Sequence, residues 1–417
     1  MKVESAEIHS ELPSDETYRH VIPYYQPIIQ LDTQNIFGYE VLGRALNIKT
    51  GSVKTLGGLF HSASASPTQL SYMIDIDYRI QESAIARLKD SRKKTQLFIN
   101  VMPRLLSRVH QNDILEKRNF HIINLVEKYD IEPSSIVIEV TEDEFLGDVS
   151  RLIGIMEIYK QAGFLVAIDD VGSGMSDLSR IAHIHPDIIK VDLQLLRNSL
   201  NHVGFRQVLQ GVSYMSYRLG SSLLFEGIEK DEELTMAMKM GAGYLQGFLF
   251  SEARGEFQDK TKFSQYLRSV MDEFSRFRLA EIIQGYQNRD GMVSAFAKIA
   301  EMIDRAGANV NACMLEILKD LPEETRKIVV YDEFGDQISS TFEKEQGQNW
   351  SRDDSTITHN ISWRPFFHHV IAAKEHTGQI FHLTEPYHDL RHQFPSVTMS
   401  YVLGDNRVMV AEVEWKS

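Results

Sequence analysis

Several polar and charged side chains stand where a short apolar segment of the chain ends. They are Asn100, Glu139, Asp169, Asp170, Lys190 and Glu226. Glu40 stands in a similar segment nearer the N-terminus and raises the number of carboxylates to five. A carboxylate among apolar residues costs free energy unless it is paired or binds a metal ion. A set of hard oxygen ligands of this size is typical of Mg²⁺ or Mn²⁺ sites.

The neighbouring Asp169 and Asp170 allow one carboxylate to bridge two ions, and a two-ion site is typical of in-line displacement at phosphorus. Lys190 would then orient the nucleophile or stabilise the transition state. Each signal has a simpler explanation when taken alone, because an Asp pair often caps a helix or a turn and a strand-end Lys is often a surface cation. Their joint spacing favours chemistry at a phosphorus centre.

These residues need a scaffold that brings the segment ends together. Eight β-branched segments, which from the third onward alternate with helical patterns, predict an α/β fold, a modified TIM (β/α)8 barrel, whose active site lies at the carboxyl ends of its strands. The first two segments are so close that they must pair antiparallel. The expected strands are Tyr24–Gln30, Asn35–Leu42, Gln96–Val101, Ser135–Glu142, Phe164–Val171, Asp187–Leu193, Ser222–Ile228 and Tyr244–Phe250.

The chain after Phe250 follows a different pattern. Phe263, Leu267, Val270, Phe274 and Phe277 share one helical face, which a helix packed on the barrel explains better than a dimer seam, since a seam needs several sustained heptads. Residues 327–342 read as a hairpin, and further strands are expected at 378–383, 396–403 and 407–415. We therefore expect an N-terminal extension (1–20), the barrel (21–255), a linking helix (256–289) and a small α+β domain with an antiparallel sheet (290–417).

The composition is that of a folded protein, with 417 residues, 43% of them hydrophobic and 24% charged. The formal net charge of −14 argues against a nucleic-acid polymer as partner, because such binding neutralises many phosphates with Lys and Arg. It allows one small nucleotide. The sequence shows neither a membrane span nor an apolar signal segment, and the single cysteine, Cys313, agrees with a reducing compartment. We expect a cytoplasmic protein without a membrane partner.

An ordered series of motifs in the barrel segment resembles that of the EAL family. The series covers roughly residues 24–251 and consists of QPI, YEVLGR, FINV, IEVTE, AIDDVGSGMSDLSRI, PDIIKVD, FEGIE and GYLQGFLFS. The resemblance implies a modified TIM barrel that binds cyclic di-GMP and, with two Mg²⁺ or Mn²⁺ ions, opens it to linear pGpG. It also implies inhibition by Ca²⁺ and a homodimer formed near the loop after Asp170.

The resemblance further implies roles for individual residues. One metal ion would be held by Glu40, Asn100, Glu139 and Asp169, and the other by Asp169, Asp170 and Glu226. The catalytic residues would be Lys190, Glu226, Gln246 and Glu142, where Lys190 contacts the attacking water and Glu142 supports the loop Val171–Asp177. The substrate would contact Gln26, Glu40, Leu42, Arg44 and Asp187, with the planar donor fork of Arg44 on a phosphate.

Three departures from the family pattern stand out. Val41 replaces the alanine of the naming tripeptide, Met102 stands where serine is common, and Glu252-Ala253 replaces a basic residue and proline. None removes an expected metal ligand. Glu252 near the mouth of the barrel could weaken substrate affinity through like-charge repulsion.

The C-terminal segment resembles the small PAS-like or Cache-like module of YkuI-type EAL proteins, particularly in NWSRDDSTITHNISWRPFFHHV. Trp363, Arg364, Phe366 and Phe367 could line a pocket in which the arginine meets a small anionic ligand. Alternatively, the aromatic residues belong to the core and Arg364 forms an ion pair.

Three functions fit this sequence. The first is a hydrolase of cyclic di-GMP regulated by its C-terminal sensory domain. The second is a catalytically weak or inactive receptor that binds cyclic di-GMP without cleaving it, and the third is an interaction module without nucleotide affinity. The intact set of expected metal ligands favours the first.

Overall fold

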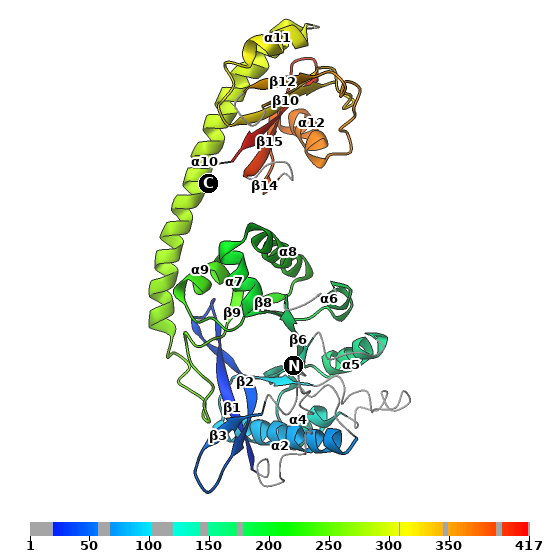
Figure 1. Cartoon of the computed structure of the whole chain (residues 1–417). Coiled ribbons are helices and arrows are strands. Elements are labelled where there is room, and N and C mark those ends of the chain that lie inside the picture. The colour runs from blue at the N-terminus through cyan, green and yellow to red at the C-terminus, as the bar shows by residue number, and fades with distance from the viewer. Residues whose placement is uncertain are drawn as a thin grey trace, which may run out of the picture. The chain divides into compact units, whose positions relative to one another are not determined.

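The computed structural model describes residues 20–56, 67–101, 120–141, 149–172, 178–307, 309–344, 349–388 and 394–415. The chain forms two compact units, Met1–Asp272 and Glu273–Ser417 (Figure 1). Of the expected N-terminal extension, only residue 20 lies within the described part.

Eight strands of the first unit close into a barrel (Figure 1). Their order around the ring is β1, β9, β8, β7, β6, β5, β4 and β2, and β2 pairs with β1 to complete it. The strands are β1 (Val21–Gln30), β2 (Asn35–Leu46), β4 (Gln96–Asn100), β5 (Ile136–Thr141), β6 (Leu165–Val171), β7 (Ile188–Val191), β8 (Ser222–Phe225) and β9 (Ala242–Leu245). Each overlaps one of the eight predicted segments, which confirms the modified TIM barrel.

The irregular strand is β1, which is antiparallel to both of its neighbours, β2 and β9. The other pairs around the ring are parallel. Gln30 pairs with Asn35 across a tight turn, so the short connection dictates the direction of β1, as predicted. The sequence did not predict β3 (Val53–Thr55), a three-residue strand that pairs with β2 outside the ring.

Helices surround the barrel and bury one apolar face each against it. On α5, Leu152, Ile155, Met156 and Tyr159 recur at helical spacing and are all buried. The described helices of this unit are α2 (Pro67–Ser91), α4 (His121–Tyr129), α5 (Val149–Gln161), α6 (Leu178–Ile184), α7 (Leu193–Asn201), α8 (Val203–Leu219) and α9 (Asp231–Lys239), with a short 3₁₀ turn η2 (Pro133–Ser135).

The second unit is built on an antiparallel sheet with the order β12, β11, β10, β16, β15, β13, to which β14 adds by pairing with β15. The predicted hairpin is confirmed, since Ile328 pairs with Phe342. The strands are β10 (Thr325–Tyr331), β11 (Thr341–Lys344), β12 (Trp350–Asp353), β13 (Phe381–Leu383), β14 (Tyr387–His388), β15 (Pro395–Val402) and β16 (Val408–Glu414).

Helices cover both faces of this sheet. The end of α10 (Ser264–Ala306) and α11 (Val310–Ile317) pack on one face, where Phe296 and Met314 contact the core around Ile328. The other face packs against α12 (Pro365–Thr377) through Phe367 and Val370.

The long helix α10 has 43 residues, begins in the first unit and ends in the second. The start of the predicted apolar face is buried on the barrel, because Phe263 and Leu267 belong to its core. The burial does not continue along the whole face, since Phe277 is 53% exposed. The expected domain boundary after residue 289 falls inside α10. Among the described residues, no helix combines the length and the apolar character needed to cross a bilayer.

Candidate active site

The interior of the barrel carries an apolar layer followed by a polar layer. The apolar layer consists of Ile28, Phe98, Val137, Ala167, Ile188 and Leu224. Side chains along a strand alternate between its two faces, so the residue two positions further points to the same interior. On the parallel strands β4 to β8 the position two residues later is polar, and on the antiparallel β1 the corresponding position lies two residues earlier. The eight strands of the ring or their immediate ends supply one polar residue each: Gln26, Glu40, Asn100, Glu139, Asp169, Lys190, Glu226 and Gln246.

Lys190 forms the centre of this polar layer. Its Nζ lies 2.7 Å from Glu139 Oε1, 2.8 Å from Asp169 Oδ2 and 2.8 Å from Glu226 Oε1. The side chains of Lys190 and Glu139 are fully buried, whereas Glu226 is 24% exposed. The structure therefore brings together four of the predicted site residues, with three carboxylates around the ammonium group of Lys190.

Burial and neighbouring charges shift the pKa values of these four residues in different directions. Burial raises the pKa of Glu139 and of Glu226 well above the usual range, against the opposing charge of Lys190. Burial also disfavours charge on Asp169, but Lys190 and a hydrogen bond from Glu226 hold the pKa of Asp169 below its usual value. The pKa of Lys190 is raised well above normal, because the surrounding carboxylates outweigh its burial.

A second set of contacts links Glu40 to the neighbouring strands. Gln246 Nε2 donates to Glu40 Oε2 at 2.6 Å and to Gln26 Oε1 at 3.3 Å, and Asn100 Nδ2 donates to Glu40 Oε1 at 3.2 Å. Gln246 is buried, and its Oε1 has no hydrogen-bond partner among the described residues. It is therefore an unsatisfied acceptor within the polar layer.

Asp170 follows Asp169 on β6 with a positive φ of 60°, a conformation that costs free energy for a residue other than glycine and often marks a functional site. Its backbone NH donates to Asp169 Oδ1 at 2.8 Å. The residue reaches solvent, yet partial burial of its carboxyl group and the charge of Asp169 raise its pKa to about 6.

The donor set fits divalent cations. Five carboxylates and one lysine carry a formal charge of −4, which two divalent ions would neutralise. Glu139 Oε2 is buried without a hydrogen-bond partner among the described residues, a costly state that a cation would relieve. As the side chains stand, no group of three His, Cys, Asp or Glu residues in the described part of the chain is arranged to hold an ion. The Lys190 ammonium instead contacts three of the five carboxylates.

The other predicted site residues lie outside the polar layer or outside the described residues. Arg44 on β2 lies with its guanidinium carbon 5.6 Å from the centre of the Tyr24 ring, and burial lowers its pKa. Leu42 lies on the same strand, half-buried. Asp187 precedes β7, and its Oδ2 accepts from the backbone NH of Val166 at 2.8 Å. The structure thus places Asp187 at the entry of its strand and not with the polar layer. Glu142, Met102 and residues 173–177 of the predicted loop lie outside the described residues.

Two supporting residues received no role from the sequence. Ser251 accepts through its carbonyl oxygen a hydrogen bond of 3.4 Å from Gln26 Nε2. Gly247 allows the chain to pass close to Ile228, since a Cβ at this position would lie 2.1 Å from the Ile228 carbonyl oxygen. Both residues belong to the motif GYLQGFLFS. The motif therefore marked these positions, but the sequence alone could not show which contacts they make.

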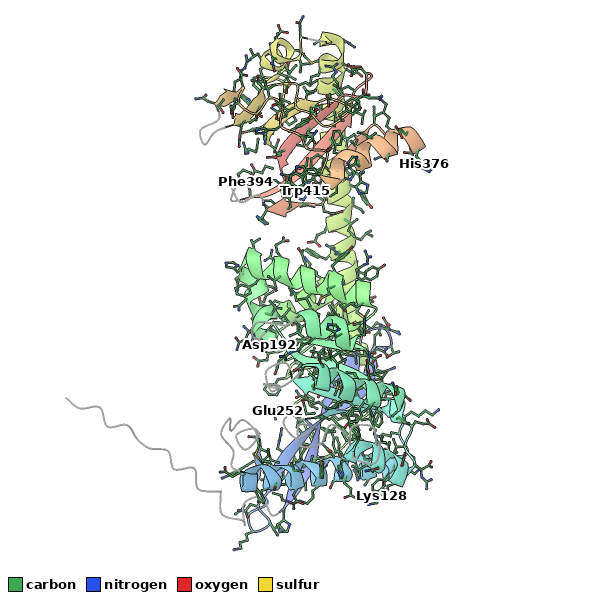
Figure 2. The ribbon with its side chains drawn as sticks, turned by 90° about the vertical axis from the view of Figure 1, so that its right-hand side faces the viewer. Lys128, Asp192, Glu252, His376, Phe394 and Trp415 are labelled. Carbon is green, nitrogen blue, oxygen red and sulfur yellow. The ribbon has the colours of Figure 1, made fainter. Side chains whose placement is uncertain are left out.

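Glu252, which replaces a basic residue of the family pattern, lies in Figure 2 on the same side of the barrel as Asp192. Asp192 directly follows β7 at its carboxyl end. This position agrees with the expectation that Glu252 stands near the mouth.

Comparison with known proteins covers both units. Residues 11–253 match the EAL domain, and residues 257–416 match a domain described as an EAL-domain associated signalling protein domain. The "uncharacterized EAL-domain containing protein YkuI" of Bacillus subtilis (strain 168) is 28% identical over 399 residues, which cover 95% of this chain and 94% of YkuI. The crystal structure of YkuI in complex with substrate c-di-GMP and calcium superposes with a TM-score of 0.84 at 26% identity, covering 96% of this chain and 98% of that one.

Two named phosphodiesterases match over little more than half of this chain. The cyclic di-GMP phosphodiesterase RocR of Pseudomonas aeruginosa is 25% identical over 238 residues, 56% of this chain and 57% of RocR. The probable cyclic di-GMP phosphodiesterase PdeA of Escherichia coli (strain K12) is 27% identical over 233 residues, 54% of this chain and 29% of PdeA. With an EAL domain that spans more than half of its length, a matching C-terminal signalling domain and the fold of YkuI, this chain belongs to the EAL-domain family.

Proposed function

We propose that this protein is a divalent-metal-dependent phosphodiesterase that hydrolyses cyclic di-GMP to linear pGpG. The observation that carries the proposal is the polar layer of the barrel, in which every strand supplies one residue and Lys190 contacts three carboxylates within 2.8 Å. RocR and PdeA, whose names describe cyclic di-GMP phosphodiesterases, match 56% and 54% of the chain.

Glu40, Asn100, Glu139, Asp169, Asp170 and Glu226 would hold two Mg²⁺ or Mn²⁺ ions. When bound, the ions supply Lewis-acid activation of water and neutralise negative charge on the phosphodiester. Lys190, once free of its carboxylate contacts, would hold the attacking water in line with the phosphorus atom through its ammonium group.

The reaction adds one water molecule across one phosphodiester bond. The water oxygen bonds to phosphorus, the bond from phosphorus to the 3′ oxygen breaks, and that oxygen takes a proton to leave as a hydroxyl group. Arg44 would contact a phosphate through its planar donor fork. Gln246, through its unpartnered Oε1, and Gln26 would orient the nucleotide or the water.

The alternative is a receptor that binds cyclic di-GMP without cleaving it. The observation in its favour is that Lys190 contacts the carboxylates themselves, so these groups have a cationic partner without metal ions. The crystal structure of YkuI likewise contains c-di-GMP together with calcium. The two functions differ in whether a bound nucleotide is consumed.

The test is to incubate the purified full-length protein with cyclic di-GMP and Mg²⁺ or Mn²⁺ and to resolve the products by chromatography. The proposal expects pGpG in amounts that grow with time and vanish when a chelator is added. Unchanged nucleotide after prolonged incubation, under conditions where binding is measured, would establish the receptor.

We also propose that the C-terminal unit, expected to be PAS-like, regulates the barrel, whereas the homodimer stays a prediction from the family resemblance. The support is that the units are joined by the continuous helix α10 and not by a flexible Gly/Ser linker. A coupling free energy of about 1 to 3 kcal/mol would change turnover severalfold or more. Equal turnover with and without small molecules from a cell extract would leave the second unit a structural role.

A further inference from the structure

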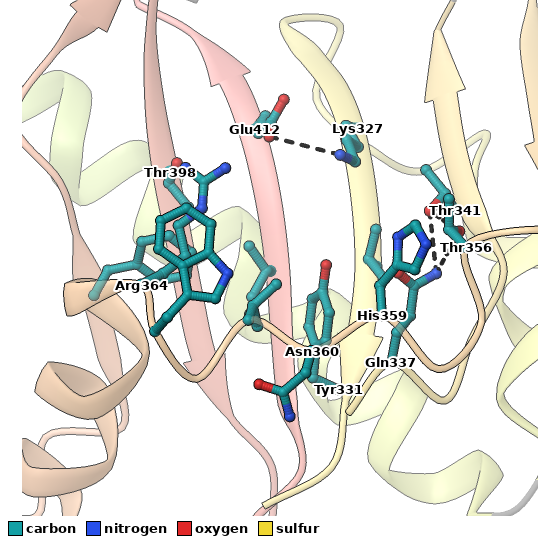
Figure 3. A pocket seen from close by; sticks show the side chains of 15 residues that line it. Lys327, Tyr331, Gln337, Thr341, Thr356, His359, Asn360, Arg364, Thr398 and Glu412 are labelled. Carbon is teal, nitrogen blue, oxygen red and sulfur yellow. Dashed lines mark hydrogen bonds and ion pairs between the residues drawn. The ribbon is translucent and has the colours of Figure 1, made fainter. Parts of the chain in front are cut away.

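The C-terminal unit contains a pocket of about 440 Å³ on the sheet face that α12 covers (Figure 3). Cavities of this size are typical of sites for small organic ligands. Strands β10 and β16 form its floor, with Lys327 and Tyr331 from the first and Glu412 from the second. The chain before α12, including Trp363 and Arg364, forms one wall.

The charged groups of the pocket leave one positive charge in excess. Lys327 and Glu412 are neighbours across the β10–β16 pair, with Lys327 Nζ 3.8 Å from Glu412 Oε1. Arg364 has no carboxylate within ion-pair distance among the described residues, and its guanidinium lies 4.6 Å from the centre of the Trp363 ring. The predicted alternative of an ion-paired Arg364 therefore does not describe this part of the chain. Figure 3 shows Lys327, Glu412 and Arg364 gathered at the end of the pocket opposite Asn360.

The hydroxyl group of Tyr331 adds a neutral hydrogen-bond donor. Burial and the negative charge of Glu412, partly offset by Arg364, raise the pKa of Tyr331 to about 12, so the hydroxyl stays protonated at neutral pH. Together with Arg364 and Lys327 it presents donors to the pocket, and donors of this kind recognise the oxygen atoms of an acidic group.

The opposite wall is already satisfied by contacts within the protein. Gln337 Nε2 donates to Thr356 Oγ1 at 2.7 Å and to Thr341 Oγ1 at 3.1 Å, and the two threonine hydroxyls lie 2.7 Å apart. These groups shape the pocket but have their hydrogen-bonding capacity used within the protein. A charged ligand group would therefore be recognised at the end that holds Arg364.

Aromatic side chains provide the apolar surface. Trp363 lines the pocket and is 72% exposed, which is unusual for so large a ring. Phe366 lines the pocket and is half-buried. Phe367, in contrast, points into the core and is 1% exposed, so the predicted aromatic cluster divides between core and pocket.

We propose that this pocket binds a small organic carboxylate with a single negative charge and a flat apolar body. The guanidinium of Arg364 would take the carboxylate in a bidentate contact, and Trp363 and Phe366 would pack on the apolar body. A second negative charge is disfavoured because it would face Glu412, and inorganic phosphate lacks the body that the aromatic wall requires. This site is separate from the proposed hydrolysis, and its test does not depend on that activity.

Phenylacetate is the probe, and the full-length protein is titrated with it in the absence of metal ions and nucleotide. Calorimetry gives the Kd, and tryptophan fluorescence reports the location, because Trp363 lines the pocket. We expect saturable binding with a fluorescence change that Trp363→Phe removes. Acetate and inorganic phosphate should bind at least about tenfold more weakly.

Arg364→Gln is the decisive variant and should weaken phenylacetate binding about tenfold or more, since it removes a charge-assisted contact. The folding of α12 should not suffer, because the Arg364 side chain forms no capping hydrogen bond. Arg305→Gln is the matched control, an exposed arginine on α10, and should leave the Kd within about twofold. No saturable binding of phenylacetate, an equal Kd in Arg364→Gln, or equally tight binding of phosphate would each overturn the proposal.

Discussion

The two units of the chain use the same pair of residue types, lysine and glutamate, in opposite ways. In the barrel, Lys190 and Glu139 are fully buried and 2.7 Å apart. In the C-terminal pocket, Lys327 and Glu412 lie 3.8 Å apart and are 22% and 19% exposed. Solvent exposure and the longer distance make the Lys327–Glu412 contact weak. Burial of Lys190 and Glu139, in contrast, shifts the pKa values of the whole group. The difference agrees with the two proposals, a metal site in the barrel and a site of reversible ligand binding in the C-terminal unit.

The largest expected effect comes from removing one carboxylate of the buried group. Asp169→Asn keeps the volume of the side chain but removes the charge shared by both expected metal ions. Turnover of cyclic di-GMP should fall by about 10³-fold or more, the equivalent of several kcal/mol of transition-state stabilisation. Glu139→Gln should reduce the turnover of cyclic di-GMP to a similar extent. Chromatographic rates together with the Mn²⁺-induced rise in Tm measure the effect, and a variant that keeps both would refute the assigned ligand set.

Lys190→Ala should reduce kcat by about 10²-fold or more while KM changes little, because its ammonium acts mainly in the transition state. Without metal ions the variant should also be destabilised by about 3 to 5 kcal/mol, since three carboxylates lose a buried partner. Mn²⁺ should restore much of that stability. Steady-state kinetics and denaturant unfolding supply the data, and near-normal kcat would remove Lys190 from the mechanism.

Replacing Mg²⁺ or Mn²⁺ by Ca²⁺ should preserve binding and suppress turnover. Ca²⁺ forms longer bonds with looser geometry, so it fills the site but misplaces the reacting groups. We expect at least about a tenfold loss of rate at saturating Ca²⁺. Competition between Ca²⁺ and Mn²⁺ in the same assay would show whether the two ions share the site. Rates with Ca²⁺ equal to those with Mn²⁺ would contradict the proposed role of coordination geometry.

A structural carboxylate of the barrel should behave differently from the buried group. Glu233 is buried and accepts hydrogen bonds from the backbone NH of Glu229 at 2.7 Å, from that of Lys230 at 3.2 Å and from Arg197 Nε at 2.6 Å. Glu233→Gln should lower the free energy of unfolding by about 1 to 3 kcal/mol.

The pH dependence of this effect has a definite sign. Burial opposes ionisation, but Arg197 and the two backbone donors lower the pKa of Glu233. Its contribution is therefore complete above the ordinary glutamate pKa of about 4.3 and is lost as pH falls through the lower folded value. The difference between wild type and Glu233→Gln should shrink in that acidic window. Glu232→Gln, a change of an exposed neighbour, is the control, and equal effects of the two would discount the buried contacts.

The smallest effect is expected in the C-terminal pocket. Glu412→Gln is the same isosteric change as Glu139→Gln, but the pair with Lys327 is long and partly solvated. The free energy of unfolding should change by only about 0 to 1 kcal/mol, and the Mn²⁺-induced rise in Tm should match the wild type. A loss of that rise would mean that the two regions are not independent in metal binding.

The barrel and its polar layer could be predicted because periodicity and strand ends are local signals. Each expected strand overlaps an observed one. Glu139, Asp169, Lys190 and Glu226 were expected to lie together because parallel strands end at the same edge of the sheet. The direction of the Asp187 side chain could not be predicted, since its contact with Val166 depends on the register between β6 and β7. The contacts between Lys190 and three carboxylates also depend on side-chain packing, which spacing does not encode.

The course of the chain after the barrel was harder to predict. The pattern from Phe263 to Phe277 indicated a helix, but it could not show that only Phe263 and Leu267 enter the barrel core. Helical patterns do continue in the sequence beyond Phe277, as far as about residue 319, but they could not show that one unbroken helix, α10, runs from Ser264 to Ala306. A helix that packs first on one hydrophobic core and then on another keeps its helical periodicity throughout. The pattern therefore predicts the helix but not the boundary between the two units.

The most direct test of the central claim is a single-turnover experiment with the full-length protein in excess over cyclic di-GMP. All of the nucleotide is then bound, and Mn²⁺ is added to start the reaction. Hydrolysis predicts that the bound cyclic di-GMP converts to pGpG in one exponential phase, which Asp169→Asn abolishes. Quantitative recovery of bound, intact cyclic di-GMP after Mn²⁺ addition would contradict the proposed phosphodiesterase and leave a receptor.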